Sequence, residues 1–408
     1  MDPTSIRLLH LADIHIGMEN YGQLDADVGI NSRVVDFLRC FDEAIEYALG
    51  NEVDLVIFAG DAYKTRDPNS TYRREFAHRV KRLADAGIPV LLLVGNHDLP
   101  TAARRASSIS IFQTLGVANV TVADTGKVHR ITTRRGLPVQ VATIPYPIRS
   151  RLLAHDEFKD MSFHKLDAEL QKLITGNIQA LVEELDPCIP AILAAHLSVS
   201  EAKQGSEQHV MIGRDVVILK SVVADPAFDY VALGHIHKHQ DLNQGAHPPV
   251  VYAGSIERID FGEEGEEKGF VVADVAKGQA SYQFIPVHAR PFITIRIRAE
   301  GPDPMAQIRD EIARHDVRGA VVRVMIRVGE EEEKLIQEQE IRRALKGAHY
   351  ISTIHKDVER RYRQRLGGHS PETLTPQEAL RRYLEAKEVP PERIETLLEY
   401  ADRIFQET

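Results

Sequence analysis

Asn96, His97 and Asp98 have the clearest potential for chemistry in this sequence. They follow the apolar segment 89–94, which is too short for a helix and rich in branched residues, as buried parallel strands are. In open α/β sheets, ligands bind at the carboxyl ends of the strands. Asn96 offers an amide oxygen to a hard cation, His97 titrates near neutral pH, and Asp98 could orient His97 by accepting its second ring proton. A polar turn also has a purely structural explanation, so the interpretation depends on donors elsewhere.

Donors of the same kind end other apolar segments of the chain. Asp13 and His15 stand two positions apart in an extended segment, so their side chains point the same way and can bind one ion. A single histidine after an apolar run is usually a satisfied core residue, but here several donors are expected at one sheet edge. The further donors are Asp13, His15, Asp61, His196, His235 and His237.

With Asn96, these residues make seven candidate metal ligands. Carboxylate, imidazole and amide groups without thiolate suit Mn²⁺, Fe²⁺ or Zn²⁺ better than copper or an iron–sulfur cluster. Seven donors exceed the needs of one ion and suit two ions about 3.5 to 4 Å apart, bridged by one carboxylate. Only Cys40 and Cys188 are present, so we expect neither a disulfide framework nor a thiolate site. The histidines without a strand-end position are expected to be bystanders: His10, His78, His129, His155 and His239.

The elements that must position these donors follow the pattern of an α/β fold. Apolar strands alternate with two helices at residues 33–49 and 72–86, so three strand–helix units deliver polar residues to one sheet edge. Residues 117–144 are expected to form short antiparallel strands, and residues 166–185 a long helix. The expected strands of the sheet are residues 6–12, 53–59, 89–94, 191–195, 230–233, 250–253 and 270–275.

The carboxyl-terminal part of the chain has a different pattern. From about residue 290, apolar and polar residues alternate as in half-exposed strands, which predicts a small separate α+β unit. An arginine-rich segment ending in two glycines predicts a linker. The predicted domains are residues 1–288 for the main unit, 289–355 for the small unit, 356–371 for the linker and 372–408 for a helical pair.

The helical pair begins with Thr375, Pro376 and Glu378, the pattern of a capped helix with proline at its first position. A second amphipathic helix follows Pro391. Two short helices beyond a linker cannot bury both of their apolar stripes on each other. We therefore expect residues 372–408 to dock on another protein, with folding back on the preceding domain as the alternative.

The strand-end motifs resemble those of the calcineurin-like metallophosphoesterases. The motifs are Asp13-x-His15, Gly60-Asp61, Gly95-Asn96-His97-Asp98 and Gly234-His235-x-His237. Within that superfamily, nearly the whole chain resembles the SbcD family of bacterial nuclease subunits, whose archaeal and eukaryotic relatives process DNA double-strand breaks. The resemblance includes the segment 252–263 and the sequence Glu267-Lys268-Gly269-Phe270.

The resemblance implies a two-sheet sandwich flanked by helices, with a small capping domain and a terminal helical pair. It implies His97 as the acid that protonates the leaving oxygen, with Asp98 beside it in the catalytic set. The implied ligands are Asp13, His15, Asp61 and His237 for one ion, and Asp61, Asn96, His196 and His235 for the other.

Two features depart from the family pattern. Many relatives have an acidic residue or histidine three positions after the bridging aspartate, whereas this chain has Lys64. DNA contacts assigned to that position therefore do not carry over. The loop at residues 18–32 is longer than the common pattern, although Arg33 and Asp36 match the family's Arg-x-x-Asp.

The resemblance also implies cofactors and partners. Two divalent ions are expected, with Mn²⁺ as the metal, and DNA is the implied substrate, attacked at duplex ends, in single strands and in hairpins. The chain has no phosphate-binding loop of its own, so no nucleotide is expected to bind it. ATP would act through an SMC-like coiled-coil ATPase, SbcC, bound by residues 372–408. The family also implies a homodimer.

Composition is compatible with this function. Hydrophobic content of 43% and charged content of 27% are ordinary for a globular protein. No signal pattern or long apolar run occurs, which predicts a cytoplasmic protein without a membrane segment. The net charge of -10 argues against coating nucleic acid by bulk electrostatics, yet a local basic groove or bound metal ions would overcome it.

Two other functions fit parts of the sequence. A small-molecule or cyclic-nucleotide phosphodiesterase would explain the metal ligands but would leave residues 290–408 without a role. A metal-stabilised adaptor for an ATPase would explain the terminal helices, but the complete ligand set and His97 argue for an enzyme.

Overall fold

The computed structural model describes residues 4–25, 29–100, 106–148, 161–203, 205, 215–359, 375–387 and 389–406. Contacts within the chain define two compact units. The first consists of residues 1–294, 316–323 and 345–353, and the second of residues 295–315, 324–344 and 354–408. The predicted domain boundaries at residues 288, 355 and 371 remain predictions.

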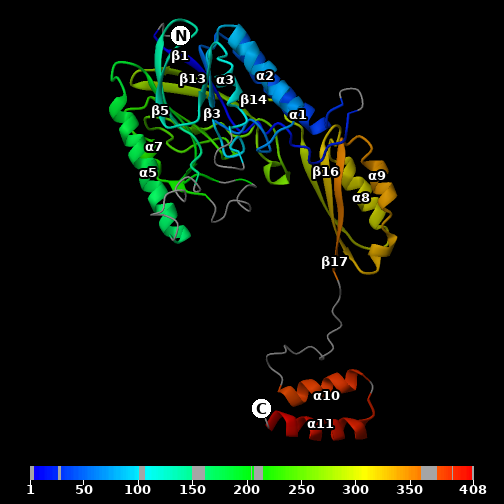
Figure 1. Cartoon of the computed structure of the whole chain (residues 1–408). Coiled ribbons are helices and arrows are strands. Elements are labelled where there is room, and N and C mark those ends of the chain that lie inside the picture. Colours follow the sequence, from blue (N-terminus) through cyan, green and yellow to red (C-terminus); the bar gives the residue numbers. More distant parts are fainter. Residues whose placement is uncertain are drawn as a thin grey trace. The chain divides into compact units, whose positions relative to one another are not determined.

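The first sheet holds the predicted strand–helix units. Strands β1 to β4 are parallel and lie side by side, and β13 and β14 extend the sheet antiparallel to β1 in the order β14-β13-β1-β2-β3-β4. Its elements are β1 (Ile6–Leu11), α1 (Ser32–Gly50), β2 (Leu55–Phe58), α2 (Ser70–Asp85), β3 (Val90–Leu93), α3 (Ile111–Thr114), β4 (Val120–Ala123), β13 (Gly269–Ala276) and β14 (Gln279–Pro286). Figure 1 shows these elements in sequence colours.

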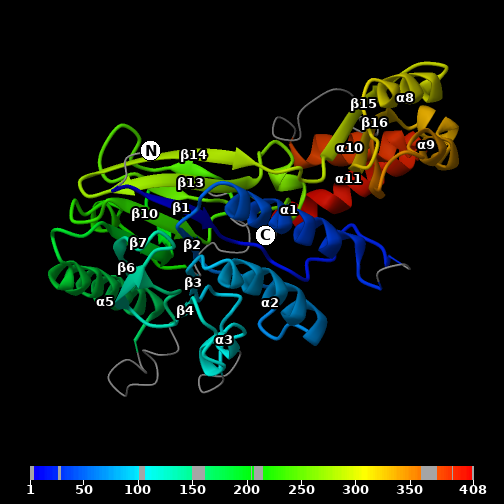
Figure 2. The same cartoon turned by 90° about the horizontal axis from the view of Figure 1, so that it is seen from above.

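The second sheet has the order β11-β12-β10-β7-β6-β5, with a parallel centre and antiparallel edge strands. Helix α5 lies beside β6 (Figure 2) and also contacts β5 and β9. Its strands and neighbours are β5 (Lys127–Thr132), β6 (Pro138–Ile144), α5 (Phe163–Glu184), β7 (Ala191–His196), β8 (Ser198–Val199), β9 (Val217–Ile218), α7 (Lys220–Val223), β10 (Tyr230–Gly234), β11 (Gln240–Asp241), β12 (Val250–Tyr252) and the 3-10 turn η2 (Phe261–Glu263).

The two sheets pack face to face and have helices on their outer sides. Leu91 of β3 and Ile192 of β7 belong to one buried cluster, which contains side chains of both sheets. A second cluster joins the outer face of the first sheet to α1 and α2, and a third joins the other sheet to α5. Strands buried on both faces explain the continuous apolar runs of the sequence. The predicted two-sheet sandwich flanked by helices is confirmed.

Residues 117–144 differ from the expectation in one respect. β5 and β6 form the predicted antiparallel pair, but β4 joins β3 as a parallel strand of the first sheet. The chain therefore passes from one sheet to the other between β4 and β5. An apolar pattern indicates a strand but not its partner, because pairing depends on the tertiary arrangement.

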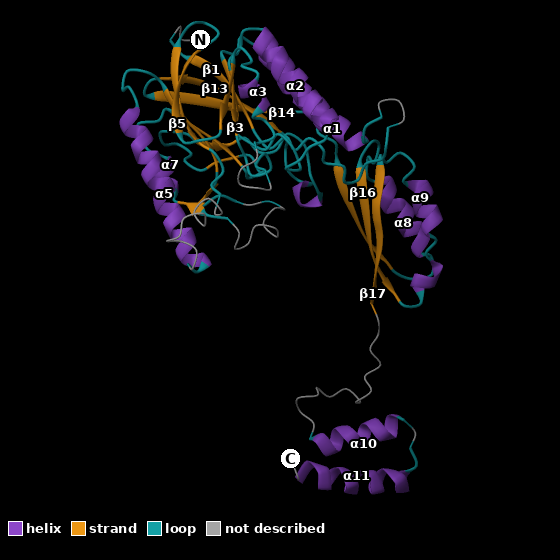
Figure 3. Cartoon of the chain, viewed as in Figure 1, coloured by secondary structure: helices purple, strands orange, loops and turns teal. Residues whose placement is uncertain are grey.

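The small predicted unit consists of a three-stranded sheet and two helices. Its elements are β15 (Phe292–Ala299), α8 (Pro304–Ala313), β16 (Val321–Gly329), the 3-10 turn η3 (Glu332–Leu335), α9 (Glu338–Ala344) and β17 (Tyr350–Glu359). Figure 3 shows α8 and α9 along one face of the sheet. Ile295 and Ile326 are buried, whereas Arg296 and Arg327 in alternate positions are exposed, as the sequence pattern predicts.

The terminal helices α10 (Pro376–Ala386) and α11 (Pro391–Gln406) pack against each other (Figures 1 and 2). Thr375 and Glu378 form the predicted capping box at the start of α10. Ile394 and Leu398 of α11 are buried, while the neighbouring Leu397 is 38% exposed. The pair therefore buries one part of its apolar surface and leaves another part exposed. None of the described helices combines the length and the apolar character needed to cross a membrane.

The face between the sheets provides a test of the fold. Replacing the fully buried Leu91 by alanine should lower the free energy of unfolding by about 2 to 5 kcal/mol, because it leaves a cavity between the sheets. Leu173 of α5 is 45% exposed, and Leu173→Ala should change the free energy of unfolding by less than about 1 kcal/mol. Chemical denaturation of both variants measures the difference. Equal effects would contradict the burial of Leu91 between the sheets.

Candidate metal centre

All nine residues predicted for the site come together at one end of the sandwich. The first sheet supplies those that follow β1, β2 and β3, and the second sheet supplies those at the ends of β7 and β10. The contributions of the first sheet are Asp13, His15, Asp61, Asn96, His97 and Asp98, and those of the second are His196, His235 and His237. Neither sheet could form the cluster alone.

One group of donors contains Asp13, His15 and His237. The Nε2 atoms of His15 and His237 are 3.0 Å apart. An oxygen of Asp13 lies 4.0 Å from His15 Nε2, and Oδ2 of Asp61 lies 3.9 Å from the same nitrogen. These ligand atoms are gathered closely enough to share one ion.

The other group contains Asn96, His196 and His235. The amide oxygen of Asn96 lies 3.0 Å from His196 Nε2 and 3.0 Å from His235 Nδ1. Oδ2 of Asp61 is 3.5 Å from His196 Nε2. The same Asp61 oxygen therefore faces both groups, which is the position of a carboxylate that bridges two ions through one oxygen.

The donor spacing fits metal coordination. Two ligand atoms bound about 2.1 Å from one ion and separated by roughly a right or tetrahedral angle are about 3.0 to 3.4 Å apart. The contacts of 3.0 Å within each group match that spacing. Three overlapping sets of the described residues can each hold an ion, and two of these sets include Asp61. Oxygen and imidazole donors without thiolate suit a dinuclear centre of divalent ions.

Comparison with known proteins identifies the family. The family model described as calcineurin-like phosphoesterase matches residues 6–239, more than half of the chain. The chain belongs to this family. The predicted enzyme class, a phosphodiester hydrolase, is confirmed.

Several curated relatives of this phosphoesterase have nuclease names. It is 27% identical over 278 residues to the SbcD subunit of the nuclease SbcCD from Bacillus subtilis, covering 67% of each chain. It is 30% identical over 273 residues to the Escherichia coli K12 protein of that name, covering 64% of this chain and 63% of the relative. It is 27% identical over 321 residues to "DNA double-strand break repair protein Mre11" of Haloferax volcanii, covering 79% of this chain and 61% of the relative. The resemblance to the SbcD family is confirmed.

The backbone of this phosphoesterase is strained where the donors lie. Asp13, His15, Asp61 and His235 all have positive φ, between 49° and 99°, which non-glycine residues rarely adopt. Hydrogen bonds between the loops after β1 and β2 hold this conformation, because the N–H groups of Asp13 and His15 donate to the carbonyl oxygens of Gly60 and Asp61. Strain of about 1 to 3 kcal/mol per residue persists only where the surrounding structure enforces it.

Two glycines allow the strand ends to approach each other closely. A Cβ atom on Gly60 would lie 2.3 Å from His196 Nδ1, and one on Gly95 would lie 2.2 Å from Asp61 Oδ1. Any side chain at these positions would push away a donor. The glycines of the Gly60-Asp61 and Gly95-Asn96 motifs are therefore required by packing against the donors.

The expected contact between Asp98 and His97 is not formed, and this part of the prediction is wrong. The Asp98 carboxylate instead accepts hydrogen bonds from the N–H groups of Gly95, Asp61 and Ala62, at 2.8 to 3.0 Å. A buried carboxylate is most stable where several N–H groups converge on it, and the turn after β3 supplies them. Asp98 therefore fixes the loops that carry Asp61 and Asn96 and does not orient His97. Burial and the nearby charge of Asp61 raise the pKa of Asp98 to about 7.

His97 is held by backbone groups. Its Nδ1 lies 2.7 Å from the carbonyl oxygen of Lys64, so this nitrogen carries the proton and Nε2 keeps a lone pair. Its own N–H donates to Oδ1 of Asp61. Burial lowers the pKa of His97 from its ordinary value. The ring also stands close enough to His15 and Asp61 for the three to be able to hold an ion together.

Charges within the cluster depend on one another. Burial alone would lower the pKa of His196, but the adjacent Asp61 carboxylate outweighs this and raises it to about 9. Burial would raise the pKa of Asp61, but His196 and its neighbours hold it well below its ordinary range. This carboxylate is therefore ionised and available to bind cations.

Two carboxylates that contact the donors were not predicted. Asp215 contacts His235, and Glu263 contacts His237. Glu263 lies within the family segment 252–263, which is the one signal that could have marked it. Asp215 precedes the apolar run 216–219, whereas the predicted donors follow such runs, and it belongs to no motif, so the sequence offers no indication of its place.

The bystander histidines for which contacts are described have structural roles. His10 is buried in the sandwich, where its ring contacts the Tyr230 hydroxyl and the carbonyl oxygen of Leu233. His239 contacts the carbonyl oxygen of Tyr252 and stacks on Phe284. His155 lies outside the described residues.

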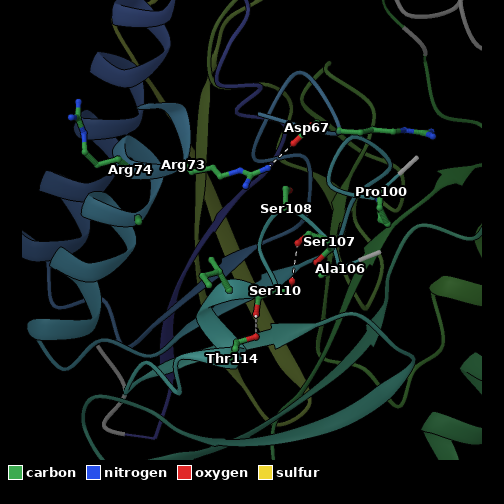
Figure 4. Close-up of a pocket in the computed structure, with 12 residues that line it drawn as sticks. Asp67, Arg73, Arg74, Pro100, Ala106, Ser107, Ser108, Ser110 and Thr114 are labelled. Atoms are coloured by element: carbon green, nitrogen blue, oxygen red, sulfur yellow. Dashed lines mark hydrogen bonds and ion pairs between the residues drawn. The ribbon is translucent and has the colours of Figure 1, made fainter. Parts of the chain in front are cut away.

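A pocket of about 610 Å³ lies next to the loop that follows Asp98. Arg66 belongs to its lining. Arg73 and Arg74 line it from α2, and Ser107 and Ser108 lie on another loop (Figure 4). The Ser108 N–H donates to the carbonyl oxygen of Asp98, which links this loop to the turn of the metal centre. Arg73 is paired with Asp67 at 2.8 Å, and no ion pair of Arg66 is found among the described residues. Arg74 is paired with Glu75 at 2.8 Å, so the lining combines one arginine without a described ion pair with hydroxyl groups and apolar side chains such as Pro100 and Ile111.

The shared position of Asp61 predicts the metal content. After reconstitution with Mn²⁺, metal analysis should find close to two ions per chain. Asp61→Ala should reduce the occupancy of both sites, because one carboxylate faces both groups of donors. Replacing the exposed Asp85 by alanine should leave the content unchanged. Complete loss of one ion with full retention of the other in Asp61→Ala would show that Asp61 is not a bridge.

Proposed function

We propose that this phosphoesterase is the metal-dependent nuclease component of a DNA repair complex. In this proposal it cleaves duplex ends, single strands and hairpins together with an SMC-like ATPase, SbcC. The observation that carries the proposal is the convergence of the seven predicted donors beside His97, in a chain similar to the SbcD component of the nuclease SbcCD over about two thirds of its length. The relatives with DNA repair names support DNA as the substrate.

The proposed ligand sets follow the two groups of donors. Asp13, His15, Asp61 and His237 would hold one ion, and Asp61, Asn96, His196 and His235 the other. Two divalent ions supply positive charge for the scissile phosphate and lower the pKa of the attacking water. Mn²⁺ is the proposed metal, because imidazole and carboxylate donors both suit it.

His97 is the proposed proton donor to the leaving oxygen. The Lys64 carbonyl occupies Nδ1, which leaves Nε2 as the nitrogen for proton exchange. A general acid must be protonated before it reacts. Burial lowers the pKa of His97, and the negative charge of a bound phosphodiester would raise it again.

The arginine-lined pocket supports a polyanionic substrate. Arg73 and Arg74 are paired with Asp67 and Glu75, so Arg66 is the arginine of the pocket for which the described residues show no ion pair, in a protein with a net charge of -10. Contacts of arginine and lysine with phosphates supply essentially all of the non-specific affinity of proteins for nucleic acid. A DNA strand that leaves the metal centre past His97 would meet this pocket.

The terminal helices are the proposed docking element for the ATPase. Tyr383 of α10 and Leu397 and Tyr400 of α11 are exposed large side chains on a folded helical pair. Fully burying such a side chain contributes about 1.5 to 3 kcal/mol. A homodimer is part of the same proposal, and the exposed Ile111 and Leu115 next to the pocket offer apolar surface for it.

A nuclease assay tests the proposal and the role of His97. The wild-type chain should cleave linear duplex and hairpin DNA in the presence of Mn²⁺ and not in its absence. His97→Asn should slow this cleavage by about 10²- to 10⁴-fold and retain metal and DNA binding, because it removes the proton donor alone.

His78→Asn is the matched control, because His78 is exposed on α2 and its replacement should leave the wild-type rate unchanged. Hydrolysis of small phosphodiesters without any cleavage of DNA would favour the stand-alone phosphodiesterase. Loss of metal in His97→Asn would reassign the residue as a ligand.

Removal of the terminal helices tests the docking proposal. Deleting residues 372–408 should leave metal-dependent cleavage of simple substrates intact, and it should abolish co-purification with the ATPase and ATP-stimulated cleavage of duplex ends. Leu397→Asp combined with Tyr400→Asp should have the same effect, because both side chains are exposed while Leu398 is buried within the pair. Glu399→Lys, on another side of α11, is the control. A truncated chain that still binds the ATPase would exclude this docking site.

A further inference from the structure

Two histidines of the centre each contact a carboxylate. The contact is made by the ring nitrogen that points away from the other metal donors. His235 Nε2 lies 2.5 Å from Oδ2 of Asp215, while its Nδ1 faces Asn96. His237 Nδ1 lies 2.9 Å from Oε1 of Glu263, while its Nε2 faces His15. In each ring, one nitrogen points to the metal donors and the other to a carboxylate.

Asp215 is itself held by two hydroxyl groups. The Tyr146 hydroxyl donates to its Oδ1 at 2.7 Å, and the Ser198 hydroxyl donates to its Oδ2 at 3.0 Å. The Tyr146 ring also packs beside the rings of His196 and His235. The carboxylate therefore has a fixed position from which it can determine the orientation of the His235 ring.

Glu263 is anchored in a different way. Its side chain is fully buried, and Lys268 Nζ lies 2.9 Å from Oε2. The same oxygen accepts the N–H of Ile259 at 3.0 Å, and Lys268 also donates to the carbonyl oxygen of His237. A buried lysine thus holds both the carboxylate and the backbone of the histidine that contacts it.

The remaining rings lack such a carboxylate partner. His196 Nδ1 contacts the carbonyl oxygen of Ala59 at 2.7 Å. His15 Nδ1 is buried and has no hydrogen-bond partner among the described residues. Each of the two proposed ion sites therefore contains one histidine that is supported by a carboxylate.

We propose that Asp215 and Glu263 are positioning residues, each serving one ion of the centre. Asp215 would secure the ion bound by Asn96, His196 and His235, and Glu263 the ion bound by Asp13, His15 and His237. A carboxylate that accepts the N–H of one ring nitrogen keeps the lone pair on the other nitrogen and fixes the ring angle toward the metal. This inference rests on the two-metal centre proposed above.

Metal titration of Asp215→Asn and Glu263→Gln tests the proposal. Each variant should bind one Mn²⁺ with wild-type affinity and the other about 10- to 100-fold more weakly. Electron paramagnetic resonance should show a single ion at Mn²⁺ concentrations that give a coupled pair in the wild type. Cleavage should recover at high Mn²⁺, because the defect lies in metal affinity and not in the chemical step.

Double variants identify which ion each carboxylate serves. Asp215→Asn should weaken metal binding no further in a His235→Ala background, because the histidine that it orients is absent. In a His237→Ala background its effect should add to that of the histidine substitution. Glu263→Gln should show the reverse dependence. If each carboxylate variant had the same effect on metal binding in the His235→Ala and His237→Ala backgrounds, the assignment of each carboxylate to one ion would be overturned.

Asp229→Asn is the matched control. Asp229 is a buried carboxylate that contacts Lys277 and accepts the N–H groups of Ala191 and Gly278, as Glu263 contacts Lys268, but it does not touch the donors. Its replacement should lower the melting temperature and leave both Mn²⁺ affinities unchanged. Weaker binding of metal in this control would show that general destabilisation explains the effect.

Two milder variants test the proposal if Asp215→Asn or Glu263→Gln does not fold. Tyr146→Phe removes one hydroxyl that holds Asp215, and Glu263→Asp keeps the charge beside Lys268 but withdraws it from His237. Each variant should lower the affinity for the corresponding ion, and the factor should be smaller for Tyr146→Phe. Two ions bound with wild-type affinity in these variants would overturn the inference. A wild-type chain that binds fewer than two ions would instead refute the two-metal centre.

Discussion

The Asp61 carboxylate stands buried between the two groups of donors, and its two oxygens contact different partners. Oδ2 faces His15 on one side and His196 on the other, at 3.9 and 3.5 Å. Oδ1 accepts the N–H of His97, which places that ring beside the centre. An isolated buried carboxylate would be costly, so the position is stable only with cationic partners or bound metal ions. The strand ends, the two glycines and the turn at Asp98 all keep the Asp61 carboxylate in place.

This arrangement has a structural cost that the rest of the fold offsets. Four of the donors have strained backbones, and several buried polar groups lie together in one region. The sandwich can carry this cost because apolar side chains of both sheets and three helices surround it. Local conflict with ordinary backbone preferences is typical of functional sites.

The metal centre and the proposed docking element belong to different units of the fold. The metal donors and the arginine pocket belong to the first unit, whereas the exposed apolar residues of α10 and α11 belong to the second. The net negative charge of the chain makes the local cationic groups and the metal ions decisive for any contact with DNA. Substrate binding in the proposed function thus depends on a small region of the surface.

The sequence by itself determined the central strands of the sandwich and the nine residues that gather at their ends, whereas the edge strands β11 and β14 were not predicted. Apolar runs buried on both faces are distinctive, and parallel strands bring their carboxyl ends to one edge whatever the loops between them. The capping box at Thr375 was equally predictable, because its contacts are local. Only the tertiary structure decided that β4 pairs with β3, that Asp98 holds backbone groups, and that Asp215 and Glu263 support two histidines. These contacts join residues far apart in the chain or depend on the direction of a side chain in a turn, and no sequence period records either property.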